Sequence, residues 1–170
     1  MSERQTEFMR RNALLQYLPK LSGLIGREVS ERDLMQVEET NALSCRLRAI
    51  PREYTSISSF NFDDLEKQWN DTLASKLASS HPGPVVVYAA DALACGAMML
   101  DSLSAFRCRF SFDVIPEGVI SIATADGKNC ATLDLCVRPT GEKIVEVELS
   151  GEAWSKIDAG STRPSEGELT

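Results

Sequence analysis

The sequence predicts an α+β fold, in which N-terminal helices pack on one face of a mixed, mainly antiparallel sheet. Two observations predict this class. Apolar side chains recur at helical spacing through much of the first half of the chain, whereas from residue 105 onward they alternate with polar ones. Between these patterns lies the longest nearly apolar stretch, residues 84–100. It predicts a buried strand followed by a helix, and it should hold the helical layer to the sheet.

Length and charge narrow the classes of protein to consider. A chain of 170 residues is most often one domain, and we expect a single α+β domain over residues 1–158. Residues 159–170 are polar and rich in Gly, Ser and Pro, which predicts a disordered tail. The net charge is -7, and residues 56–170 hold nine basic and seventeen acidic residues. Such acidity argues against nucleic acid or an anionic membrane as the partner.

Cysteine usage and hydropathy predict a cytoplasmic protein. No apolar segment follows the basic N-terminal residues, so no secretory signal is expected. The 84–100 stretch is short for a membrane span and carries Asp91 at its centre. An odd number of cysteines at irregular spacing predicts reduced thiols: Cys45, Cys95, Cys108, Cys130 and Cys136. His81 is the only histidine, which excludes a multi-histidine metal site, and we expect no metal and no cofactor.

The first 80 residues should be mostly helical. A stripe of apolar residues predicts a helix over 5–26, with Pro19 as a possible kink. Ser30 and Asp33 resemble a capping box that opens a second helix, which runs to about residue 42. Residues 43–50 fit either helix or strand, and the polar run 51–61 predicts a connecting loop.

A third helix is predicted over 62–79, and its first turn carries carboxylates that complement the helix dipole. After it, residues 85–90 predict a central strand. Asp91 should then cap a helix over 92–104. The following strand would run parallel to the first through a right-handed crossover.

The period-two pattern from residue 105 predicts a four-stranded antiparallel meander, over about 106–114, 119–124, 130–137 and 145–149, followed by a short helix around Trp154. One face should carry the apolar members of the alternation: Phe106, Phe110, Phe112, Leu133, Leu135, Val145, Val147 and Leu149. The other face should carry Arg107, Arg109, Asp113, Thr132, Asp134, Glu146 and Glu148. A charged sheet face of this kind is a platform for a protein partner.

No catalytic, metal, nucleotide or nucleic-acid motif is present in the sequence. We therefore expect a non-enzymatic, acidic, protein-binding protein, most simply an inhibitor of the immunity or antitoxin type that neutralises a basic partner such as a toxin. The candidate partner-binding residues are Asp113, Asp134, Glu146, Glu148, Asp63 and Asp64. Two alternatives stay open: a chaperone of a secreted effector, and a small enzyme or ligand-binding domain with its site near Asp91.

Overall fold

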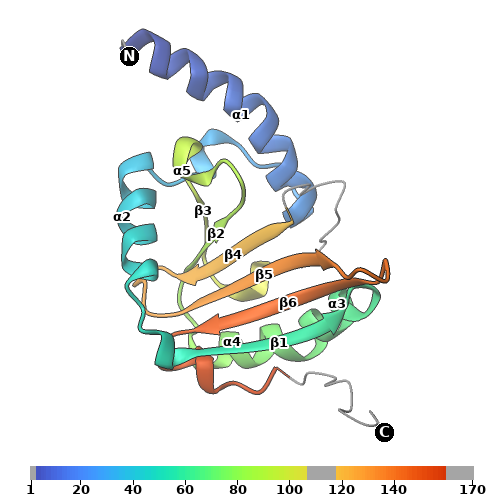
Figure 1. Ribbon diagram of the computed structural model, residues 1–170. Helices are drawn as coiled ribbons and strands as arrows, with labels where there is room; N and C mark the ends of the chain where they lie inside the picture. Colours follow the sequence, from blue (N-terminus) through green and yellow to red (C-terminus); the bar gives the residue numbers. More distant parts are fainter. Residues whose placement is uncertain (1–2, 107–117, 160–170) are drawn as a thin grey trace, which may run out of the picture.

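The computed structural model describes residues 3–106 and 118–159 (Figure 1). Helices and a six-stranded sheet combine, with N-terminal helices first, which confirms the α+β class. The strand order is β1-β6-β5-β4-β2-β3, and every pairing between these strands is antiparallel. The sheet is therefore antiparallel throughout the described residues, and the expected parallel component is not found there.

The first helix, α1 (Glu3–Ile25), contains Pro19 without ending there, as the periodicity predicts. Only its second half is buried in the body of the protein, through Leu14, Tyr17, Leu21, Leu24 and Ile25. Its first half leads away from the rest of the chain (Figure 1), and the expected stripe residues Phe8 and Leu15 are exposed.

The second helix begins later than the capping pattern indicates. The Asp33 carboxylate accepts hydrogen bonds from the N–H and the hydroxyl of Ser30, at 2.8 and 2.9 Å. These bonds close only a 3₁₀ turn, Glu31–Asp33, and α2 spans Val37–Arg48. The open question about residues 43–50 is thus resolved in favour of helix as far as Arg48.

The predicted loop over 51–61 is wrong, because most of it forms a strand, β1 (Thr55–Asn61). It lies at the edge of the sheet and pairs along its whole length with β6 (Lys143–Ser150). Phe60 is its only buried residue. Because this edge strand buries a single apolar side chain, its sequence shows no hydrophobic alternation from which a strand could be predicted.

The helix expected over 62–79 is confirmed. It is built from α3 (Phe62–Gln68), a π-helical stretch (Trp69–Leu73) and α4 (Ala74–Ser80). Leu65, Trp69 and Leu73 face Phe60 and Val147 of the sheet. These helices cover what we call the inner face of the sheet.

The 84–100 stretch contains two strands and a short helix, whereas the sequence predicts one strand and a long helix. After β2 (Val85–Tyr88), α5 covers only Ala92–Cys95, and β3 (Met98–Leu100) then returns antiparallel to β2. Gly96 ends the helix with φ of 104°, a conformation outside the helical range. The expected helix over 92–104 is therefore wrong.

The two sides of β2 are occupied by β3 and by β4 (Val119–Thr124), both antiparallel. Both edges of β2 are therefore paired with antiparallel strands. The strand expected over 106–114 lies outside the described residues beyond Phe106, which is buried and meets Trp69 edge-on with ring centroids 5.7 Å apart.

The remaining meander is confirmed: β4, β5 (Cys130–Val137) and β6 follow one another and pair in order. The described apolar residues assigned to the inner face, Leu133, Leu135, Val145, Val147 and Leu149, are buried. Trp154, in a 3₁₀ turn (Trp154–Lys156), is fully buried as expected. Of the predicted tail, only Ala159 lies within the described residues, and it is buried.

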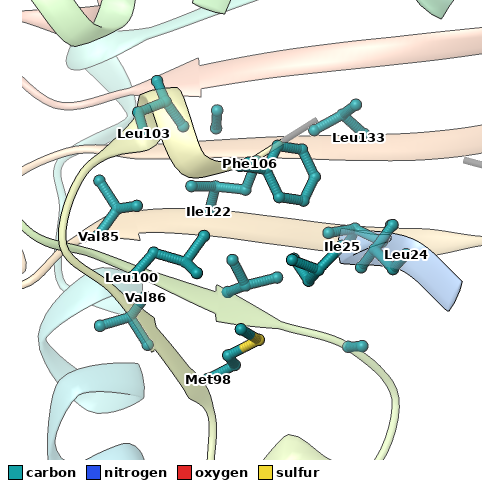
Figure 2. Packing of buried hydrophobic residues seen from close by; sticks show 14 of the residues in the cluster. Leu24, Ile25, Val85, Val86, Met98, Leu100, Leu103, Phe106, Ile122 and Leu133 are labelled. Carbon is teal, nitrogen blue, oxygen red and sulfur yellow. The ribbon is translucent and has the colours of Figure 1, made fainter. Parts of the chain in front are cut away.

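The inner face forms one core with the helices. Figure 2 shows Leu24 and Ile25 from the end of α1 near the strand that carries Ile122, with Met98 and Phe106 in the same cluster. The core thus joins the N-terminal helix to the strands of the 84–100 stretch and of the meander.

Candidate functional site

A groove of about 630 Å³ lies between α2 and the opposite, outer face of the sheet. Its volume falls in the range of about 300–1,000 Å³ that is common for ligand pockets. The residues that line it come from α2, from the end of β2 with the turn into α5, and from β4, β5 and β6: Ser44, Leu47, Arg48, Tyr88, Ala89, Ala90, Ala92, Leu93, Val119, Ser121, Cys130, Thr132, Glu148 and Ser150. The outer face is therefore partly covered by a helix, where the sequence predicts helices on one face only.

The floor of the groove is a row of neighbouring side chains across four strands. The register places Tyr88 beside Ser121, Ser121 beside Thr132, and Thr132 beside Glu148. The hydroxyls of Ser121 and Thr132 lie 3.0 Å apart and share a hydrogen bond. Because these two side chains are short, they leave space between the sheet and α2.

Thr40 of α2 holds the helix at this distance from the sheet. Its backbone carbonyl accepts a hydrogen bond from the Tyr88 hydroxyl at 3.0 Å, and its own hydroxyl accepts one from the N–H of Ala97 at 2.9 Å. Burial raises the pKa of Tyr88 to about 12, so the phenol remains a hydrogen-bond donor at neutral pH. The groove is thus framed by one buried and one half-buried hydrogen bond.

Three carboxylates gather on adjacent strands at the groove, whose lining includes one of them, Glu148. We call Asp134, Glu146 and Glu148 the acidic row. Asp134 and Glu146 are directly opposite each other in the β5–β6 pairing, and Glu148 lies two residues further along β6. Glu146 and Glu148 are exposed and Asp134 is half-buried.

The acidic row lacks a cationic partner in the described part of the chain. None of the ion pairs found within residues 3–106 and 118–159 includes one of its members. Glu148 accepts a hydrogen bond from the Ser150 hydroxyl at 3.2 Å. The pKa of the neighbouring Cys136 thiol is raised by burial and by the negative charges of Asp134 and Glu146. Negative charge therefore surrounds Cys136, whereas Arg48 of α2 lines the groove together with Glu148.

The structure brings together only half of the predicted partner-binding residues. Asp134, Glu146 and Glu148 share the outer face, as the alternation predicts. Asp63 and Asp64 lie in the first turn of α3, which belongs to the helical layer on the inner face, and they are not part of the row. Asp113 lies outside the described residues.

Asp91 does not play the capping role that its position predicts. It stands before α5, but its side chain makes no capping hydrogen bond, and its backbone carbonyl accepts from the N–H groups of Ala94 and Cys95. Asp91 is also absent from the lining of the groove, although Ala90 and Ala92 on either side belong to it.

The thiol in the groove is not an activated nucleophile. Burial, together with the nearby charge of Glu148, raises the pKa of Cys130 to about 11. The reactive form of cysteine is the thiolate, which is a very small fraction at neutral pH when the pKa is this high. The groove thus offers binding surface rather than nucleophilic chemistry at this residue.

The contribution of α2 to the site was missed from the sequence. The residues concerned are Ser44, Leu47 and Arg48, which lie in the segment whose pattern fits both helix and strand. Nothing in that pattern predicts that they lie over the sheet.

Within the described residues no cluster of three or more His, Cys, Asp or Glu side chains is arranged to hold a metal ion. None of the described helices has the length and hydropathy that crossing a bilayer requires.

Comparison with known protein families, with curated proteins and with solved structures finds no match for this chain. The functional argument therefore begins from the groove and the acidic row themselves.

Proposed function

We propose that this chain is a non-enzymatic inhibitor that neutralises a basic protein, such as a toxin, by binding it on the outer face of the sheet. The acidic row supplies the charge that attracts the partner, and exposed apolar side chains beside it supply contact area. Ile57, opposite Glu148 on β1, is 65% exposed, and Val119, opposite Asp134 on β4, is 40% exposed.

One observation carries the proposal. Asp134 and Glu146 are like charges directly opposite each other in an antiparallel pair. Such a pair destabilises a sheet by up to about 1 kcal/mol, and a sheet designed only to be stable would avoid it. A cationic partner placed over the row would convert this repulsion into attraction.

Charge of this kind also accelerates binding. Complementary potentials steer a basic partner toward the row and raise the association rate, most strongly at low ionic strength. An inhibitor needs no catalytic nucleophile. The raised pKa of the Cys130 thiol in the groove, which keeps the thiol protonated, agrees with this.

The proposal is tested with a triple variant, Asp134→Asn, Glu146→Gln and Glu148→Gln. The tagged full chain is used to recover proteins from an extract of its native cells, at low and at physiological salt. We expect wild type to retain a basic protein that the triple variant loses. A matched control, Glu28→Gln, Glu53→Gln and Glu152→Gln, changes the net charge equally at exposed positions elsewhere and should retain the partner.

A second measurement separates binding from folding. Glu146→Gln alone should raise the free energy of unfolding by about 0.2–1 kcal/mol, because it removes the repulsion with Asp134. The same change should weaken partner binding. Equal retention of the partner by the two triple variants, or a loss of stability in Glu146→Gln, would contradict the proposal.

A further inference from the structure

The groove between α2 and the outer face of the sheet carries charges of both signs. Arg48, in the last turn of α2, and Glu148, on β6, both line it, and both are exposed. Neither residue belongs to any of the ion pairs found within residues 3–106 and 118–159, so the two are not paired with each other either. The helix and the sheet therefore each contribute one charge that a ligand can engage.

The rest of the lining is mostly apolar. Its apolar members are Leu47, Tyr88, Ala89, Ala90, Ala92, Leu93 and Val119. The hydroxyl of Tyr88 is already bound to the Thr40 carbonyl, so this residue offers a ligand its aromatic ring. On the floor, the hydroxyls of Ser121 and Thr132 share one hydrogen bond at 3.0 Å. A hydroxyl has one donor and two acceptor lone pairs, so these two side chains keep capacity for further hydrogen bonds.

Apolar walls with a few polar groups are typical of small-molecule sites, in which the polar groups fix the orientation of the ligand. A carboxylate is the natural partner of the Arg48 guanidinium, and an ammonium group is the natural partner of the Glu148 carboxylate. A ligand with a single charge would leave one of these residues without a partner. The lining is therefore best matched by a molecule that carries both charges on an apolar body, and the groove of about 630 Å³ has room for it.

We propose that the groove binds a zwitterionic small molecule with an apolar body, of the kind found in apolar amino acids and short apolar peptides. The ligand carboxylate pairs with Arg48 and its ammonium group pairs with Glu148, while its apolar side chain packs against Tyr88 and Leu93. This inference does not rest on the proposed inhibitor function. A ligand bound at Glu148 would, however, compete with a basic protein for that carboxylate.

The full chain is titrated with phenylalanine and, separately, with the dipeptide phenylalanyl-leucine, each to roughly 10 mM, and amide NMR spectra are recorded. We expect saturable shift changes at the residues that line the groove. The ligand with the lower dissociation constant identifies the source of the zwitterion, a free amino acid or a peptide. N-acetylation removes the ammonium charge and amidation removes the carboxylate. Each should raise the dissociation constant about two- to fivefold, as expected for an exposed ion pair.

The decisive measurement combines these derivatives with protein variants. Glu148→Gln should weaken binding of the unmodified ligand by the same factor and should then be insensitive to N-acetylation. Arg48→Gln should likewise become insensitive to amidation. Both positions are exposed, so neither substitution disturbs the core. The matched controls, Glu146→Gln and Arg32→Gln, remove the same charges at exposed positions outside the groove lining and should bind the ligand as wild type does.

The control Glu146→Gln also separates this inference from the proposed function, because it should weaken binding of a basic protein and leave the small ligand unaffected. Three outcomes overturn the inference. The first is the absence of saturable shift changes in wild type with both ligands. The second is that the acetylated and amidated derivatives bind as tightly as their parents. The third is an equal loss of affinity in Glu148→Gln and Glu146→Gln, which would indicate attraction by overall charge without a site in the groove.

Discussion

The hydroxyl of Thr40 accepts a hydrogen bond from the backbone N–H of Ala97 at 2.9 Å, and both residues are fully buried. Thr40 belongs to α2, whereas Ala97 lies between α5 and β3. The Tyr88 hydroxyl, at the end of β2, binds the backbone carbonyl of the same threonine. One residue therefore connects α2 to both ends of the segment between β2 and β3, and it sets the position of the helix over the groove.

Substitution of Thr40 by Val should destabilise the protein by about 1–3 kcal/mol. Valine has the same shape but no hydroxyl, so the Ala97 N–H would be buried without an acceptor. Chemical denaturation measures the loss. Thr40→Ser is the control, since it keeps the acceptor and loses only a methyl group, at a cost of about 1 kcal/mol. A valine variant as stable as wild type would show that the hydrogen bond is unimportant.

The substitution Gly96→Ala should lower the free energy of unfolding by more than about 2 kcal/mol. Gly96 has φ of 104°, and a Cβ atom there would collide with the carbonyl oxygen of Met35. That carbonyl is part of the backbone and cannot move aside cheaply, because the Met35 N–H is bound to the Ala97 carbonyl at 2.8 Å.

The matched control for this glycine is Gly141→Ala. Gly141 also has a positive φ, 83°, but a Cβ atom there meets open space. Its replacement should cost only the backbone strain, about 1–2 kcal/mol. Thermal or chemical unfolding of the two variants compares them directly. Equal losses would mean that the close approach to Met35 adds nothing.

Asp126, in the turn between β4 and β5, should make stability depend on pH. Burial opposes its ionisation, but hydrogen bonds from the Thr124 hydroxyl at 2.6 Å and the Lys128 N–H at 3.0 Å outweigh burial and lower the pKa of the carboxyl. A folded-state pKa below the unfolded value adds stability above the unfolded pKa, near 3.9, and this stability is lost as the pH falls through the folded value.

We therefore expect Asp126→Asn to be less stable than wild type at pH 7, by about 0.5–1 kcal/mol, because asparagine can still accept these bonds but has no charge. The difference should disappear at acidic pH, once the aspartate of the wild type is protonated. Urea denaturation of both proteins between pH 7 and pH 2.5 measures it. A gap of constant size over that range would exclude the charge as its cause.

The helices and strands whose apolar residues recur with a regular period could be predicted from the sequence. The helix over 62–80 and the second half of the helix over 3–25 bury a recurring apolar stripe, and the strands of the meander alternate because one face is buried. The same alternation places Asp134, Glu146 and Glu148 together on the outer face, so half of the candidate site followed from local sequence alone. A side chain's face in a strand depends only on its position in the alternation.

The remaining features depend on contacts between distant parts of the chain. A Ser-rich segment becomes the edge strand β1 because β6 offers hydrogen-bonding partners, with Phe60 as its only buried residue. The 84–100 stretch turns back as β3 because Gly96 leaves the helical conformation. Residues 43–48 are helical and lie over the sheet because Thr40 is bound to Ala97, 57 residues away. The sequence alone thus determined which side chains of the meander strands β4, β5 and β6 are buried and which carry the charge, whereas only the tertiary structure decided that a helix and a sheet face would form a groove beside that charge.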